Sequence, residues 1–114
     1  MSVAAFAEDY VAGFNHAVAS GDFSGLIARF TDDVVMRFEN VPPAGRSLEF
    51  AGREACAAAY AQNPPDDQIE VTGEPAAEGG LVVIPFAWRR EGSPGTMRLA
   101  MTGDRVSAVT VTFG

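Results

Sequence analysis

Four strand-like segments follow one another in the second half of the sequence, and they limit the possible folds more than any other feature. They read QIEVTG, LVVIPFAWRR, TMRLAMT and RVSAVTVTF, and glycine-bearing loops separate them. Their β-branched and aromatic residues, with apolar side chains in alternation, are typical of strands that bury one face. A tight hairpin is predicted at Gly103-Asp104. A run of strands without intervening helices indicates antiparallel pairing.

The first half of the sequence is mainly helical in pattern. Ser2 is placed to cap a helix that runs to about Ala19, and the apolar stripe of that helix is formed by Phe6, Tyr10, Phe14 and Val18. A short second helix follows Gly21, a strand is predicted over residues 34–38, and a third helix reads REACAAAYAQ. Helices first and strands last predict an α+β fold in which a curved antiparallel sheet wraps around N-terminal helices.

Length and charge exclude several classes of function. The 114 residues are expected to form one domain, residues 1–114, and 8 Lys and Arg against 15 Asp and Glu give a net charge of −7. This charge opposes binding to nucleic acid or to an anionic membrane. No apolar run reaches the ~18 residues of a membrane span, and the N-terminal segment is acidic where a signal peptide is basic. A cytoplasmic protein is therefore expected.

Metal and cofactor chemistry is not expected either. The sequence contains one histidine, His16, and one cysteine, Cys56, which are too few for a metal site and exclude an internal disulfide. Its glycines do not form a phosphate-binding loop. We therefore predict no cofactor.

Several stretches together resemble a known superfamily. The run YVAGFNHAVASGDFSGLIARFTDDVVMRFEN, the helix GREACAAAYAQ, the strand IPFAWR and the closing RVSAVTVTFG look like the ketosteroid isomerase and polyketide cyclase (SnoaL-like) branch of the nuclear transport factor 2-like superfamily. The resemblance covers nearly the whole chain. It implies a cone, made of a strongly bent sheet closed by helices around a pocket, and a dimer through the outer face of the sheet.

The isomerase residues of that branch do not carry over to this sequence. On the resemblance, Phe14 stands where the oxyanion-hole tyrosine lies and Phe38 where the general-base aspartate lies. The third residue, a protonated aspartic acid in the family, falls on Met97, or on Arg98 if the last hairpin is shifted by one residue. The apolar faces of the last two strands favour Met97. Little isomerase activity is expected, because both a base and an oxyanion donor are lost.

The predicted pocket wall is apolar. The expected lining residues are Tyr10, Phe14, Met36, Phe38, Tyr60, Phe86, Trp88, Met97, Leu99, Val111 and Phe113. The alternative is that these large side chains fill the cone and form a packed core. No catalytic residue is assigned, but side chains that could polarise a carbonyl are Tyr10, Asn40 and Arg98. Arg90, on the same strand face as Trp88, could reach the rim.

Three functions follow from these observations. The first is binding of a small apolar molecule without the isomerase residues. The second is an isomerase, cyclase or lyase that acts on a steroid- or polyketide-like molecule with a rearranged site. The third is a ligand-free interaction module. In each case we expect a homodimer through the convex sheet face, which carries small and apolar side chains.

Overall fold

The computed structural model describes residues 2–114, and three helices precede or interrupt a large sheet. Helix α1 spans Val3–Ser20, α2 spans Ser24–Ile27 and α3 spans Arg53–Gln62. Ser2 caps α1, because its Oγ accepts a hydrogen bond from the backbone N–H of Ala5 at 3.0 Å. Gly21 ends the helix in the left-handed region, with φ of 78°, where glycine carries no steric penalty.

Seven strands form one sheet in the order β2-β1-β7-β6-β5-β3, with β4 paired to β5. Their bounds are β1 Phe30–Val41, β2 Arg46–Ala51, β3 Ile69–Val71, β4 Ala76–Glu78, β5 Leu81–Trp88, β6 Pro94–Thr102 and β7 Arg105–Phe113. The α+β class is confirmed. The sheet is mixed, because β1 and β7 run parallel while the other pairs are antiparallel. Antiparallel pairing is expected for strands joined by short turns, whereas β1 and β7 come from opposite ends of the chain.

Two strands differ from the sequence prediction. β1 begins four residues before the predicted residue 34 and ends three residues after residue 38. Its early part contains Thr31, Asp32 and Asp33, a sequence typical of a turn. These residues can adopt an extended conformation here because their polar side chains are not buried. β4 has the sequence AAE, which carries no strand signal, and it forms through pairing with β5.

The last hairpin has the register that its apolar faces predict. Thr102 pairs with Arg105 around the two-residue turn Gly103-Asp104, and Met97 pairs with Val111. Met97 is 4% exposed and belongs to the core. Arg98 pairs with Thr110 and therefore lies on the opposite face.

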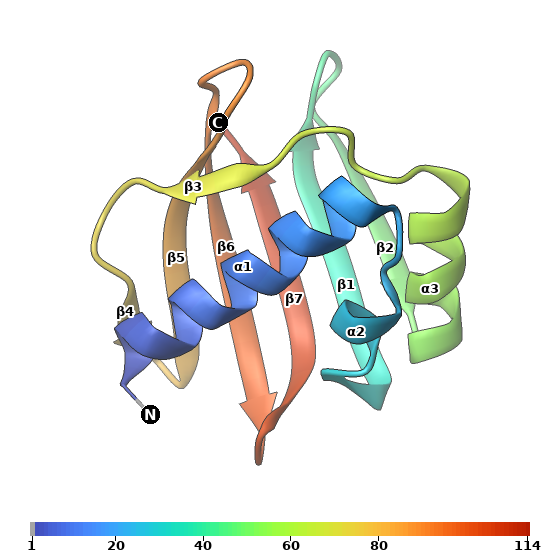
Figure 1. The fold of residues 1–114 in the computed structure, drawn as a ribbon, viewed down its shortest axis with the longest axis vertical. Coiled ribbons are helices and arrows are strands. Elements are labelled where there is room, and N and C mark those ends of the chain that lie inside the picture. Colours follow the sequence, from blue (N-terminus) through green and yellow to red (C-terminus); the bar gives the residue numbers. More distant parts are fainter. Residues whose placement is uncertain (1) are drawn as a thin grey trace.

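The helices cover only one face of the sheet, which we call the inner face (Figure 1). Helix α1 crosses this face diagonally, and α3 stands beside the β1-β2 edge. The core lies between α1 and the inner face, where Phe30, Ile84 and Leu99 are fully buried. No charged side chain is buried in the described residues. Within residues 2–114, no helix has the length and apolar character needed to cross a membrane.

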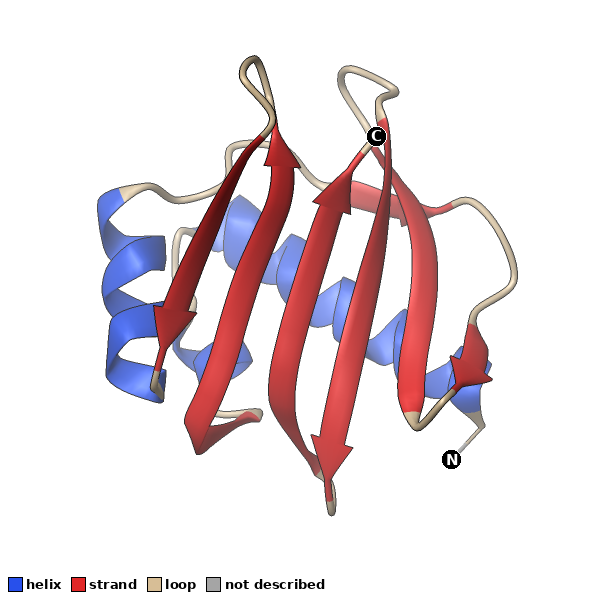
Figure 2. Cartoon of the chain, turned by 180° about the vertical axis from the view of Figure 1, so that it is seen from behind, coloured by secondary structure: helices blue, strands red, loops and turns tan. Residues whose placement is uncertain are grey.

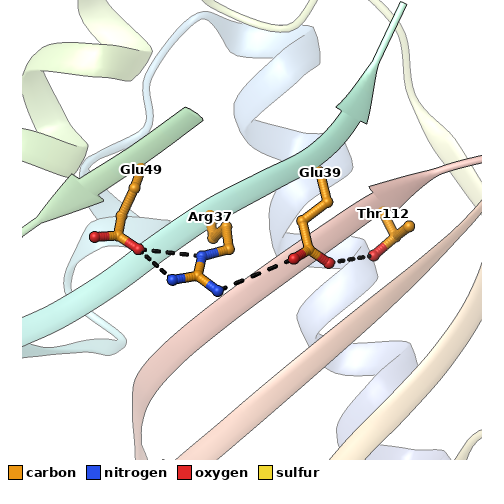
Figure 3. Close-up of polar contacts among 4 residues, drawn as sticks. All are labelled: Arg37, Glu39, Glu49 and Thr112. Atoms are coloured by element: carbon orange, nitrogen blue, oxygen red, sulfur yellow. Dashed lines mark hydrogen bonds and ion pairs between the residues drawn. The ribbon is translucent and has the colours of Figure 1, made fainter. Parts of the chain in front are cut away.

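Within residues 2–114, no helix lies on the outer face (Figure 2). Over β2, β1 and β7 it holds a row of polar contacts (Figure 3). Arg37 Nη2 lies 2.6 Å from Glu49 Oε1, and Arg37 Nη1 lies 4.0 Å from Glu39 Oε2. Thr112 Oγ1 donates to Glu39 Oε1 at 3.2 Å. These groups are partly or largely solvent-exposed, so each pair is expected to stabilise the fold only slightly.

Candidate functional site

A cavity of about 760 Å³ opens at the end of the molecule where β1 and β7 finish and β6 begins. Three loops surround its mouth: residues 42–45 after β1, residues 63–67 after α3 and residues 89–93 after β5. The sheet supplies the inner wall, and α3 closes one side with Ala59 and Tyr60. The pocket is therefore built by strand ends and loops at one edge of the inner face.

Aromatic side chains dominate the wall. Trp88 and Phe113 are stacked, with ring centroids 6.1 Å apart and an interplanar angle of 16°. The ring centroid of Phe38 lies 6.5 Å from that of Phe113 and 6.2 Å from that of Phe50, and the Phe38–Phe50 pair is edge to face. Phe50, Phe38 and Phe113 share a wall because β2, β1 and β7 are neighbours in the sheet and these side chains point to the same face. Trp88 lies on the same face of β5 and reaches Phe113 across β6. All four line the cavity and are only partly buried, so their rings are available to a ligand.

The predicted pocket residues divide into two groups. The cavity is lined by Met36, Phe38, Tyr60, Trp88 and Phe113. The others lie deeper, in the packed core between α1 and the sheet, and are Tyr10, Phe14, Phe86, Met97, Leu99 and Val111. The deep part of the inner face is therefore filled by side chains, and the hollow part lies at the loop end.

The three candidates for polarising a carbonyl lie in different parts of the molecule. Tyr10 is 1% exposed inside the core, and Arg98 lies on the outer face. Asn40 lies at the cavity mouth, where its φ of 57° is in the left-handed region that asparagine adopts more readily than most residues. Its Nδ2 donates to the carbonyl oxygen of Phe113 at 2.7 Å. Asn40 thus joins the ends of β1 and β7, and the three candidates do not converge on one point.

Two buried phenols remain neutral at physiological pH. Burial raises the pKa of Tyr10 well above its usual value and also raises the pKa of Tyr60. The ring of Tyr60 stacks on Phe23 at 4.6 Å and 11°, and Tyr60 lines the cavity. Burial also raises the pKa of the Cys56 thiol, which disfavours the reactive thiolate.

The mouth of the cavity is acidic. Its charged lining residues are Asp66, Asp67, Arg90 and Glu91. Arg90 is engaged with its neighbours, because its Nη2 donates to the backbone carbonyl of Asp66 at 2.8 Å and its backbone N–H donates to Asp67 Oδ2 at 2.9 Å. Three carboxylates against one guanidinium give this rim a net charge of −2.

Sequence reasoning missed part of the lining. Leu48 and Phe50 lie on β2 and pair with Phe38 and Met36, and Leu48 is a large apolar side chain that is 40% exposed. The alternation of Leu48 and Phe50 in the short run LEF could have placed them on the pocket face. The proline-containing loops around residues 42–45 and 63–67 carried no signal for a site. Within residues 2–114, no group of three or more His, Cys, Asp or Glu side chains is placed to hold a metal ion.

Comparison with known proteins agrees with this architecture. A family model described as a SnoaL-like domain matches residues 4–113. No curated protein matches the chain. Among solved structures, a proposed isomerase from Bacillus subtilis is similar with a TM-score of 0.71 and 13% identity, covering 100% of this chain and 90% of that one.

Two further structures extend the comparison. A proposed ketosteroid isomerase from Kribbella flavida is similar with a TM-score of 0.61 and 23% identity, covering 98% of this chain and 77% of that one. A nuclear transport factor 2-like protein of unknown function from Burkholderia xenovorans is similar with a TM-score of 0.65 and 21% identity, covering 94% of this chain and 81% of that one. At these identities the structures show a shared fold and not a shared activity. The family match spans nearly the whole chain, and the chain belongs to the SnoaL-like domain family with a nuclear transport factor 2-like fold.

Proposed function

We propose that this chain binds a small molecule with a largely apolar body in the cavity at the loop end, and that it lacks the ketosteroid isomerase reaction. The observation that carries the proposal is the partly exposed wall of Phe38, Phe50, Trp88 and Phe113 around about 760 Å³ of space. Small-molecule sites are usually apolar clefts of roughly 300–1,000 Å³ with a few polar groups. The third helix and the mouth loops supply those polar groups here.

The residue types at the family's catalytic positions support a binding role over isomerase chemistry. On the resemblance, Phe38 takes the position of the general base, and Phe14 and Met97 take the positions of the two oxyanion donors. Phe14 and Met97 lie in the core. None of the three can accept or donate a proton. Tyr10 and Arg98 do not line the cavity, which disfavours a rearranged site built on them. The carboxylates that line the cavity, Asp66, Asp67 and Glu91, belong to the loops at its mouth.

A thermal-shift screen tests the binding proposal. We expect at least one compound among steroid-like, polyketide-like and fatty ligands to raise the melting temperature, since a ligand at a hundred times its Kd stabilises the native state by about 2.7 kcal/mol. Ala59→Phe should reduce the shift, because Ala59 lines the cavity and a phenyl ring there would take up space that the ligand needs. Ala58→Phe is the matched control, since Ala58 is an exposed neighbour on the same helix.

Two results would contradict the proposal. One is a screen in which no compound of the three classes stabilises the wild-type protein. The other is a ligand whose stabilisation persists in Ala59→Phe to the same extent as in Ala58→Phe.

We further propose that the chain forms a homodimer through the outer face of the sheet. No helix of the described residues covers this face (Figure 2). The part of the face over β5, β6 and β7 carries small or apolar side chains, namely Leu81, Val83, Pro85, Ala100, Ala108 and Thr110. A self-complementary contact about a two-fold axis is the commonest way to bury such a surface.

Ala108→Glu should weaken this dimer by more than tenfold. Under two-fold symmetry the mutation places two carboxylates in one interface, and both lose water on association. Sedimentation velocity of the wild-type protein, Ala108→Glu and the exposed control Ala58→Glu measures the effect. A wild-type monomer at tens of micromolar, or equal dimer affinity in the two variants, would remove the outer face as the interface.

A further inference from the structure

We infer that the ligand of this cavity is an amphiphile whose apolar body lies against the aromatic wall and whose protonated amine lies at the acidic rim. The inference rests on the proposed function, because it names the chemical class that the same cavity would accept. Two independent features of the described residues support it: the charge balance of the rim and the aromatic wall.

The rim has acceptor capacity to spare and one cationic side chain against three carboxylates. Arg90 is the only cationic side chain among the described lining residues, and it is held by Asp66 through the 2.8 Å hydrogen bond to its carbonyl and a 3.8 Å ion pair to Oδ2. Asp67 accepts one hydrogen bond, from the Arg90 N–H, and Glu91 accepts one from Ser93 Oγ at 3.4 Å. A carboxylate can accept about four. A ligand N–H can therefore be bound here without displacing an existing partner.

The same charge balance rejects anionic ligands. A carboxylate that enters this mouth meets a net rim charge of −2 and a chain with a net charge of −7. Clefts lined by one sign of charge with apolar walls concentrate the field at the mouth. The rim thus favours cations over neutral ligands and neutral ligands over anions.

The wall reinforces this order. The faces of aromatic rings carry partial negative charge and attract ammonium groups, most strongly for tryptophan. Phe38, Phe50, Trp88 and Phe113 offer such rings while also burying the apolar body of a ligand. A fatty or aromatic acid would gain from burial of its apolar body but not from attraction of a cation to the rings.

A matched series of three compounds tests the inference by isothermal titration calorimetry at pH 7. The probes are 2-(1-naphthyl)ethylamine, 2-(1-naphthyl)ethanol and 1-naphthylacetic acid, which share an aromatic body and differ in charge. At low salt the amine should bind roughly three- to tenfold more tightly than the alcohol, and the alcohol more tightly than the acid, as expected for partly screened charges a few ångströms apart. About 1 M NaCl should bring the three affinities together, because the Debye length falls to about 3 Å.

A pair of double variants assigns the preference to the rim. Asp67→Asn with Glu91→Gln should reduce the ratio of amine to alcohol affinity to near one. Glu74→Gln with Glu78→Gln removes the same number of charges from the segment between β3 and β5, away from the cavity, and should leave the ratio as in the wild type.

The outcomes separate this inference from the proposed function. An acid that binds as tightly as the amine, or an amine preference that survives in Asp67→Asn with Glu91→Gln, overturns the inference and leaves the role of the cavity intact. Binding of none of the three compounds overturns the inference, and it also overturns the proposed function if the thermal-shift screen finds no ligand.

Discussion

Replacing Phe86 by alanine is expected to lower the free energy of unfolding by about 3–5 kcal/mol, a large part of the total stability of a domain of this size. Phe86 is 1% exposed, and its ring meets Trp88 edge to face with centroids 5.5 Å apart. The substitution removes buried apolar surface and leaves a void behind the cavity wall. Urea unfolding measures the loss, and an unfolding midpoint within error of the wild type would contradict the packing described for β5.

Gly95 provides an internal control for this prediction. A Cβ at position 95 would lie 2.6 Å from Cζ of Phe86, so the ring fits only because the facing residue on β6 is glycine. Gly95→Ala should therefore destabilise the wild type by about 1–3 kcal/mol through overpacking. In the Phe86→Ala background the clash is absent, so the same change should cost little. Equal costs in both backgrounds would show that the two positions are not in contact.

Phe38→Asp, which places a carboxylate where the resemblance puts the catalytic base of the ketosteroid isomerases, should destabilise the protein by about 3 kcal/mol at pH 7. It removes the contacts of Phe38 with Phe50 and Phe113 and places a carboxyl group beside apolar rings and below an acidic rim. Both surroundings should raise the pKa of the new carboxyl above the value of about 3.9 that it has in the unfolded chain. An unchanged urea midpoint at pH 7 would show that Phe38 does not contact the wall.

The pH dependence of this variant separates charge from packing. Between the unfolded and the folded pKa the native state binds more protons, so stability falls as the pH rises above about 3.9 and levels off above the folded pKa. Phe38→Asn has the same shape without the titration. The difference in unfolding free energy between the Asp and Asn variants should therefore grow from pH 4 to pH 7, by about 1.4 kcal/mol for each unit of pKa shift. A difference that is independent of pH would place position 38 in water.

Most of the fold is encoded in local patterns of the sequence. The alternation of Met97, Leu99, Val109 and Val111 predicts both the last hairpin and its register, and Ser2 and Gly21 predict the ends of α1. The parallel pairing of β1 with β7 is not visible locally, because it joins segments from opposite ends of the chain. β4 is not visible either, since its Ala-Ala-Glu sequence has no strand propensity and its conformation comes from its partner.

The candidate site was predictable only where it lies on regular strands. Phe38, Trp88 and Phe113 follow from strand faces, and all three line the cavity. Tyr10 and Phe14 were predicted to line the same pocket but lie in the packed core. The sequence could not separate the two cases, because periodicity identifies a buried face without showing whether the space beside it is filled. The acidic mouth depends on the conformations of loops, which are set by contacts such as that between Asn40 and the carbonyl of Phe113. Such contacts link residues far apart in the sequence.

Trp88 allows the central claim, that the aromatic cavity is a ligand site, to be measured directly. It is the only tryptophan of the chain, and it lines the cavity. Titration of the protein with a compound that stabilises it in the thermal-shift screen should change the Trp88 fluorescence and saturate at one ligand per chain. The affinity from this titration should be lower in Ala59→Phe than in Ala58→Phe. A stabilising ligand that leaves the Trp88 emission unchanged, or that binds both variants with equal affinity, would contradict the account.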